Sequence, residues 1–382
     1  MAYWLARERT VQEAGVLTRF DPRYWTVDFP RPMMAAATVP APDTLRVDAV
    51  FYRTSDKAYQ ACDDPRAYPF ARIARAAAAW RPDLVIHVGD YLYRENPCAA
   101  GERGCAGSPW GYGWDAWHAD LFAPAAPLFA AAPWAAARGN HESCARAGQG
   151  WWRLLDPRPL APGHDCIDPA QDPAGDTGAP YRVPIGPDAQ LAVLDLSSAG
   201  NKPIDADDPR YLAFANAWAF LRAASASGRS TIVVDHFPIL GLRGDKKHAG
   251  GVLPENRAVQ SVFARQPGPL IPDGIDLLLA GHVHLWQQTS FGARFPSQFI
   301  TGFSGTQEED VAPLPARLPP GTEAAPGAVV ERFASWTDGF GWMTLERLGP
   351  RRWAATVRDA QGRVRNRCRI DGRISRCARA QL

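Results

Sequence analysis

From residue 69 onward, short continuous apolar runs alternate with longer stretches of helical periodicity. Residues 69–80 are rich in alanine, begin with Pro69 and are followed by Pro82, a pattern that predicts a helix. Residues 84–88 form a short apolar run, which is typical of a strand buried on both faces. The same succession predicts strands at 191–196, 230–235 and 275–280, a helix at 211–224, and a closing hairpin made of 342–346 and 353–358. The pattern indicates an α/β fold, a layered sandwich of parallel or mixed sheet flanked by helices.

Residues 1–56 depart from this pattern. Residues 19–32 are aromatic and interrupted by prolines, and residues 45–52 are apolar enough for a single strand. We therefore predict an atypical N-terminal segment (1–56), a main domain (57–355) and a cysteine-containing C-terminal tail (356–382).

Composition and charge exclude several classes of function. The chain has 382 residues and a formal net charge of only +2, which does not indicate binding to nucleic acid or to an anionic membrane surface. No apolar run approaches the ~20 residues of a membrane-spanning helix. The sequence gives no indication of an oligomeric state.

Most of the 7 cysteines fall into local pairs: Cys98 with Cys105, Cys144 with Cys166, and Cys368 with Cys377, with Cys62 left over. Such pairs are typical of disulfides in an oxidising compartment and favour a periplasmic or secreted protein. The alternative is a cytosolic protein with unpaired buried thiols. The first ten residues carry charge where an export signal needs its apolar stretch, so no signal peptide is expected and the localisation stays open.

Four short polar islands follow apolar runs. They are His87-Val-Gly-Asp90-Tyr-Leu-Tyr93, Gly139-Asn140-His141-Glu142, Asp235-His236 and Gly281-His282-Val-His284. In an open α/β sheet, ligands gather beyond the carboxyl ends of the strands, so the fold is expected to bring these islands together. Their carboxylate, amide, phenol and imidazole groups are suitable ligands for a pair of metal ions.

This order of islands resembles the calcineurin-like metallophosphoesterases over roughly residues 60–350. The Gly-Asp-x-x-Tyr spacing of Asp90 and Tyr93 is similar to that of purple acid phosphatases. The resemblance implies that Asp90 bridges two metals, that Asn140, His236 and His282 complete one site, and that Tyr93 and His284 bind the other. Because phenolate is a hard ligand, the resemblance also implies an Fe(III) ion beside a divalent iron, zinc or manganese ion.

Two further histidines are candidates for contact with the substrate. The resemblance implies that His141 hydrogen-bonds the phosphate or protonates the leaving oxygen, and the alternative is that it only orients Asn140. His248 follows the His236 loop and is a weaker candidate for binding the substrate.

The family begins with Asp-x-His or Asp-x-Gly after its first strand, and neither motif occurs before residue 84. Asp48, within a predicted strand, and Asp56, after it, are the two possible substitutes, and Asp56 is the better placed. Residues 24–32 and 45–52 are also similar to a segment of phage-tail-like proteins. We therefore consider residues 1–56 to be foreign sequence joined to the main domain.

These observations lead to two hypotheses. The first is a binuclear metallophosphoesterase that hydrolyses a small-molecule or protein phosphate ester. Its activity would be weak if the missing ligand leaves a single bound metal ion. The second is a non-catalytic remnant of the same fold that binds metal or phosphate.

Overall fold

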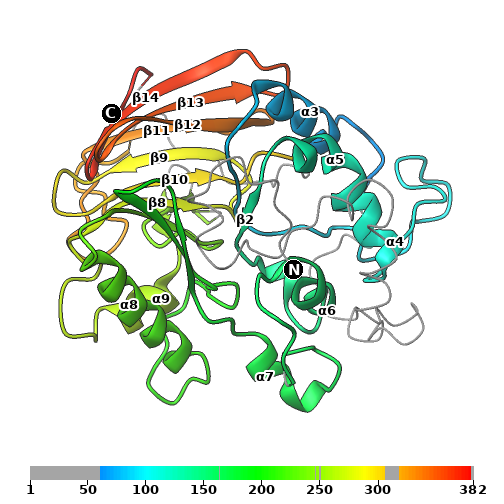
Figure 1. Cartoon of the computed structure of the whole chain (residues 1–382), viewed down its shortest axis with the longest axis horizontal. Helices are drawn as coiled ribbons and strands as arrows, with labels where there is room; N and C mark the ends of the chain where they lie inside the picture. The colour runs from blue at the N-terminus through cyan, green and yellow to red at the C-terminus, as the bar shows by residue number, and fades with distance from the viewer. Residues whose placement is uncertain (1–60, 163, 246, 249–250, 306–317, 380–382) are drawn as a thin grey trace.

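The computed structural model describes residues 61–162, 164–245, 247–248, 251–305 and 318–379 (Figure 1). Asp48 and Asp56 lie outside these residues. The strands are β1 (Val85–His87), β2 (Trp134–Ala136), β3 (Tyr181–Pro184), β4 (Ala189–Val193), β5 (Ser230–Val234), β6 (Leu242–Gly244), β7 (Val252–Pro254), β8 (Ile275–Ala280), β9 (Trp286–Ser290), β10 (Ser297–Thr301), β11 (Arg332–Trp336), β12 (Gly341–Gly349), β13 (Arg352–Asp359), β14 (Val364–Asp371) and β15 (Ile374–Cys377). The helices are α3 (Phe70–Trp80), α4 (Trp114–Trp117), α5 (Ala123–Ala131), α6 (Gly148–Gly150), α7 (Asp172–Gly175), α8 (Tyr211–Ser225) and α9 (Arg257–Phe263). The strands and helices predicted from residue 69 onward are therefore confirmed, with ends shifted by a few residues. The strand predicted at 45–52 and the atypical segment 1–56 lie outside the described residues.

The largest sheet has seven strands in the order β11-β9-β10-β8-β5-β4-β3. Its centre, β4, β5, β8 and β10, is parallel, and β3, β9 and β11 run antiparallel to their neighbours. Every residue of β4, β5 and β8 is buried, as the apolar runs predicted. This sheet is the mixed, helix-flanked sheet expected from the sequence.

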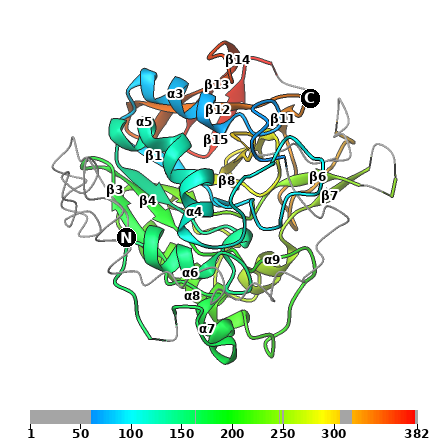
Figure 2. The same cartoon turned by 90° about the vertical axis from the view of Figure 1, so that its right-hand side faces the viewer.

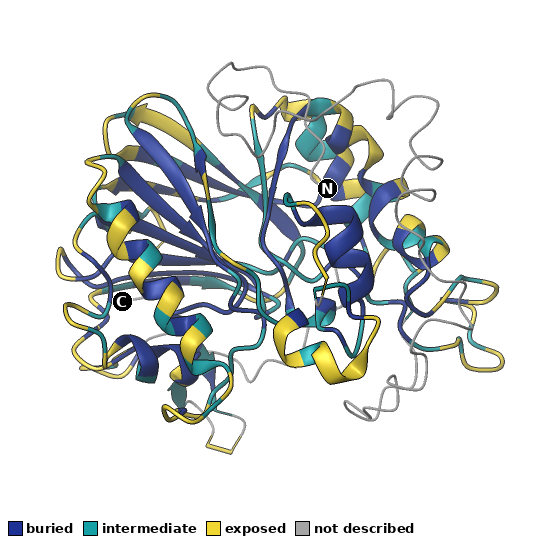
Figure 3. Cartoon of the chain, turned by 60° about the horizontal axis from the view of Figure 1, so that its bottom comes forward, coloured by how far each residue is buried: buried dark blue, intermediate teal, exposed yellow. Residues whose placement is uncertain are grey.

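Alternate residues of these strands face two different layers. Val233 and Leu278 pack with α8 and α9 on one face. Ile232 and Leu279 belong to a second cluster that includes Trp353 of β13. The core is therefore a sandwich, with helices on one side of the large sheet and a second layer of strands on the other (Figure 1). Exposed residues lie mainly on the outer helices and loops, while the strands are mostly buried (Figure 3).

The second layer holds two smaller sheets. The β12-β13-β14-β15 sheet is an antiparallel meander, and β1 pairs with β2 in parallel. The predicted hairpin of β12 and β13 is confirmed. The described residues of segment 356–382 include the end of β13 and all of β14 and β15, so they form part of this sheet. Helices α3 and α5 lie side by side over this layer (Figures 1 and 2). No helix in the described parts of the chain has the length and apolarity needed to cross a lipid bilayer.

All three predicted cysteine pairs form disulfides, and Cys62 is free. The Cys144–Cys166 bond closes a loop across a sequence separation of 22, next to the island that contains Asn140.

We expect the double variant Cys144→Ala/Cys166→Ala to lower the free energy of unfolding by ~3 kcal/mol, because the open loop gains entropy in the unfolded chain. Guanidinium unfolding of the oxidised protein measures this loss. The double variant Cys98→Ala/Cys105→Ala opens a shorter loop, so it should lose less free energy of unfolding.

Candidate metal centre

The islands lie where the sequence predicted them, shortly after the carboxyl ends of strands. Asp90 follows β1, Asn140 follows β2, His236 follows β5 and His282 follows β8. Strand β1 is parallel to β2, and β5 is parallel to β8. In each pair, the loops that follow the two strands therefore leave from the same edge of the sheet. All six predicted ligand residues come together at this place.

One group of donor atoms surrounds the side-chain oxygen of Asn140. Its Oδ1 lies 2.9 Å from His236 Nε2 and 3.1 Å from His282 Nδ1. Asp90 Oδ2 lies 3.3 Å from His236 Nε2. Two ligand atoms that each lie 2.0–2.2 Å from one ion, with an angle of about 90° at the ion, are about 3 Å apart. The distances among these four side chains are therefore suitable for binding a single metal ion.

A second group of donor atoms lies on the other side of Asp90. The Tyr93 hydroxyl lies 3.2 Å from Asp90 Oδ2 and 3.3 Å from His284 Nε2. The same carboxylate oxygen is thus close to both groups of donors. This second group comprises the three side chains of Asp90, Tyr93 and His284, and the first group comprises the four of Asp90, Asn140, His236 and His282.

The backbone that carries these ligands adopts an uncommon conformation. Asp90 and His282 have positive φ values of 57° and 65°, which non-glycine residues seldom adopt. Gly89, with φ 99°, has no room for a side chain, because a Cβ there would lie 2.5 Å from His236 Nδ1. Strain of this kind persists only where the surrounding structure enforces it, and it is concentrated at functional sites.

Glu142 holds two of the ligand loops together, a role that the sequence did not indicate. Its buried carboxylate accepts hydrogen bonds from the backbone N–H groups of Gly139 (3.0 Å), Asp90 (3.1 Å) and Tyr91 (2.7 Å). Burial and the nearby Asp90 raise the pKa of Glu142 to about 7. In the sequence, only the position of Glu142 in the motif Gly139-Asn140-His141-Glu142 connected it with the site.

The electrostatics of the ligands suit a cation. Burial alone would raise the pKa of Asp90, but His236 and His141 hold this pKa well below its usual range. Burial and His236 depress the pKa of His282, so this ring stays neutral, as a metal ligand must. Burial and Asp90 raise the pKa of Tyr93 well above its usual range, so its phenolate requires a strongly charged cation beside it.

His141 lies at the edge of the cluster, with Nε2 3.9 Å from Asp90 Oδ2. Its Nδ1 lies 2.7 Å from Glu95 Oε1, and Arg146 also contacts Glu95. Burial lowers the pKa of His141, but Asp90 and Glu95 raise it above its ordinary value overall. The sequence did not single out Glu95 and Arg146, because they lie in loops without periodicity.

The other candidate residues lie apart from the cluster. His248 is 78% exposed and its Nδ1 lies 2.6 Å from Asp245 Oδ2, and no contact of the described residues links it to the ligands. His87 stacks between Tyr91 and Trp134 as a packing residue. Asp235 is fully buried, and its oxygens accept no hydrogen bond from any described residue. Burial raises its pKa well above the usual range, which keeps it neutral.

Gly139 allows the two ligand loops to approach each other. A Cβ at this position would lie 2.1 Å from the Asp90 nitrogen and 2.2 Å from its Oδ1. We expect Gly139→Ala to displace Asp90 and lower the affinity for Zn²⁺ or Mn²⁺ by ~10–100-fold, as measured by calorimetric titration. Gly200→Ala is the matched control, because a Cβ there meets no atom within 4 Å. Equal affinity in both variants would contradict the proposed packing.

Comparisons with known proteins identify the family of the main domain. The family model of the calcineurin-like phosphoesterases matches residues 63–285, more than half of the chain. A second family model, the non-contractile tail sheath N-terminal domain, matches residues 17–65. The search of curated proteins returned no match.

Solved structures with similar folds include the purple acid phosphatase PPD1 from yellow lupin (Lupinus luteus) seeds. It shares 14% identity at a TM-score of 0.51, over 79% of this chain and 49% of that one, so the chain spans about half the length of the phosphatase. A dimetal phosphatase from Danio rerio is more distant, with 12% identity and a TM-score of 0.40 over 79% of this chain and 89% of its own. The match to the family model establishes that this chain belongs to the calcineurin-like phosphoesterase family.

Proposed function

We propose that this chain is a metal-dependent phosphoric ester hydrolase that acts on a phosphate mono- or diester. The observation that carries the proposal is the convergence of donor groups from four separate loops on one oxygen of Asp90. Asp90, Asn140, His236 and His282 would hold one ion, and Asp90, Tyr93 and His284 a second. Bound metal ions would activate water and neutralise the charge that develops on the phosphate oxygens.

The chain's own residues would provide positioning and proton transfer. Glu95 accepts a hydrogen bond from His141 Nδ1 and so leaves Nε2 directed toward Asp90. The raised pKa of His141 favours a protonated ring, which suits a donor to a phosphate oxygen or to the leaving oxygen. Glu142 would keep Asp90 and Asn140 in register by binding both loops.

The donor set supports a proposal for the metal identities. A phenolate ligand at Tyr93 favours Fe(III), and the histidine-rich group favours divalent zinc, iron or manganese. The three ligands around Tyr93 favour a second candidate function, a remnant of the fold that binds one metal ion without turnover. The three disulfides support a place of action in an oxidising compartment outside the cytosol.

Metal analysis combined with hydrolysis assays tests this proposal. Purified protein loaded with iron and zinc should retain at least one metal ion per chain, and it should release p-nitrophenol from p-nitrophenyl phosphate or its diester. Chelation should abolish the release. Bound metal without hydrolysis of either ester would favour the remnant, and the absence of bound metal would contradict both functions.

The N-terminal segment, residues 1–56, differs from the main domain in the family that it resembles. The two family matches overlap only at residues 63–65, which supports a junction between unlike sequences near these residues. We propose that residues 1–56 were joined to a phosphoesterase domain by a genomic rearrangement or a faulty gene assembly. Sequencing the locus and its transcript tests the origin, and a continuous transcript with no remnant of an Asp-containing first motif nearby would contradict it.

A further inference from the structure

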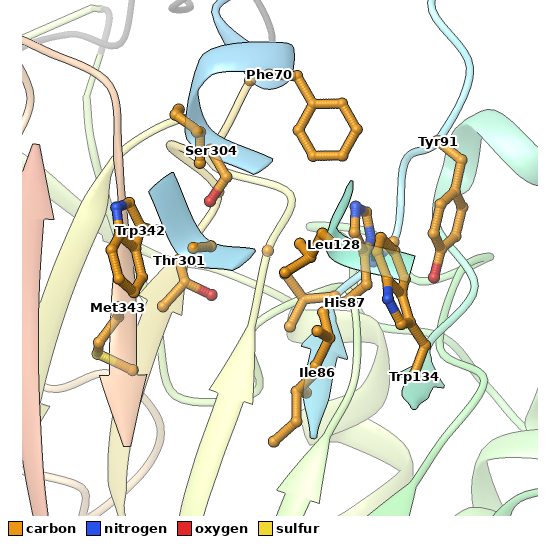
Figure 4. Close-up of a pocket in the computed structure, with 18 of the residues that line it drawn as sticks. Phe70, Ile86, His87, Tyr91, Leu128, Trp134, Thr301, Ser304, Trp342 and Met343 are labelled. Atoms are coloured by element: carbon orange, nitrogen blue, oxygen red, sulfur yellow. Dashed lines mark hydrogen bonds between the residues drawn. The ribbon is translucent and has the colours of Figure 1, made fainter. Parts of the chain in front are cut away.

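A cavity of about 910 Å³ lies between β1 and β12 and reaches the candidate metal centre. Ile86 and His87 line one side, and Trp342 and Met343 line the other, with the two strands running in opposite directions (Figure 4). Most of the candidate metal ligands also line it, namely Asp90, Tyr93, His236, His282 and His284. Cavities of roughly 300–1,000 Å³ are typical of binding sites for small molecules, so this space is large enough for a sizeable ligand.

The middle of the cavity is apolar. Val85 and Ile86 of β1 are only half-buried, whereas every residue of β4, β5 and β8 is buried. Across the cavity, Met343 and Leu345 of β12 are likewise half-buried. Removing apolar surface of this kind from contact with water is favourable. The walls of the cavity therefore favour an apolar ligand.

Apart from the candidate metal ligands, the charged side chains among the described lining residues gather at two ends. They are Asp63, Arg94 and Asp120 near the metal centre, and Asp83, Glu346 and Arg347 at the opposite end. Asp83 lies before the start of β1, and Glu346 lies late in β12, which runs the other way (Figure 4). At ~3.3 Å per residue, the stretch from Asp83 to Asp90 covers at most ~20 Å. The cavity therefore suits an extended molecule that is apolar along its length.

We propose that this cavity binds the hydrocarbon chain of the substrate, and that the substrate is a phosphate monoester of a long-chain alcohol. This assignment rests on the proposed function, because the phosphate group would lie at the candidate metal centre. The chain would extend from there between Ile86 and Met343. A short alcohol would leave the far part of the cavity to water, which finds few hydrogen-bond partners along apolar walls.

Hydrolysis of such an ester breaks the bond between phosphorus and the oxygen of the alcohol. The oxygen of a water molecule bonds to phosphorus, and a proton passes to the leaving oxygen, so the products are inorganic phosphate and the free alcohol. Contacts along the chain would hold the reacting group beside the metal centre. Binding energy from such remote contacts raises kcat/KM.

Binding of 1-decanol to the full-length chain tests the cavity separately from any metal ion. Calorimetric titration after treatment with EDTA should show binding of 1-decanol and at least 100-fold weaker binding of 1-butanol. This difference is expected because each methylene group moved out of water strengthens binding ~3–4-fold. Equal affinity for the two alcohols, or no binding of 1-decanol, would overturn the proposal.

Variants of the two walls place this binding in the cavity. Ile86→Trp fills the space from β1 and Met343→Trp fills it from β12, so each should weaken binding of 1-decanol at least tenfold. Leu212→Trp makes the same kind of change on the exposed face of α8 and should leave the affinity unchanged. Circular dichroism checks that both wall variants fold. Unchanged affinity in the folded wall variants would locate the alcohol elsewhere and overturn the proposal.

Hydrolysis separates the substrate assignment from the proposed function. The metal-loaded chain should release phosphate from decyl phosphate, below the concentration at which it forms micelles, with a kcat/KM at least tenfold higher than for ethyl phosphate. Ile86→Trp should lose this preference and still hydrolyse ethyl phosphate. Hydrolysis of both esters without a preference would reject the long-chain substrate and keep the proposed function. Binding of 1-decanol without hydrolysis of any ester would reject the function, and with it the substrate.

Discussion

Asp90→Asn should lower the affinity for divalent metal ions by at least ~100-fold and abolish any phosphate ester hydrolysis. Asp90 Oδ2 lies close to both groups of donors, 3.3 Å from His236 Nε2 and 3.2 Å from the Tyr93 hydroxyl. Replacing the carboxylate by an amide removes the negative charge that two cations would share. Metal analysis after dialysis and calorimetric titration with Mn²⁺ measure the effect.

Asp207→Asn is the matched control, because Asp207 is an exposed aspartate in the loop before α8. It should bind metal and hydrolyse ester as the unmutated chain does. The amide at position 90 keeps the size of the side chain, so the fold should survive, and circular dichroism checks this. Unchanged metal affinity in Asp90→Asn would remove the basis for the proposed function.

Glu142→Ala should lower the free energy of unfolding by ~4 kcal/mol and abolish tight metal binding. The substitution leaves the buried N–H groups of Gly139, Asp90 and Tyr91 without their acceptor, and each such loss costs ~1–3 kcal/mol. These groups lie in the loops that carry Asp90 and Asn140, so the metal centre should loosen together with the fold. Urea unfolding and metal analysis measure the two effects.

The control for this variant is Glu331→Ala, which removes an exposed carboxylate that pairs with Arg332. It should change the free energy of unfolding by less than ~1 kcal/mol. Glu142→Gln keeps one oxygen acceptor. Its loss of free energy of unfolding should therefore lie between the losses of Glu142→Ala and Glu331→Ala. A loss in Glu142→Ala no greater than in the control would show that the carboxylate does not hold the loops.

The sequence predicted the scaffold and the grouping of the candidate ligand residues because both depend on local signals. The apolar run before Asp90 and the proline-bounded helix at 69–80 are visible without any partner in space. The ligands of each island follow an apolar run, and the parallel strands bring them to one edge. The family pattern then assigned Tyr93 and His284, which the structure places on the far side of Asp90.

The supporting residues could not be predicted in the same way. Glu95, Arg146 and Asp120 act through contacts between loops that are distant in sequence, such as the bond from the Tyr93 amide to Asp120. His248 shared a sequence neighbourhood with His236, but the structure pairs it with Asp245 at the surface.

The left-handed backbone at Asp90 and His282 bears on how the chain would take up a metal ion. Both residues hold this conformation, which costs ~1–3 kcal/mol each. Contacts within the protein oppose this cost, such as the hydrogen bond from the Asp90 N–H to Glu142. We therefore expect the fold, rather than an incoming ion, to order the side chains of this centre. Small zinc domains behave differently, because they fold only when the metal binds. Metal uptake by this chain should resemble exchange at a preformed site, and the polypeptide should remain folded when the metal is withdrawn.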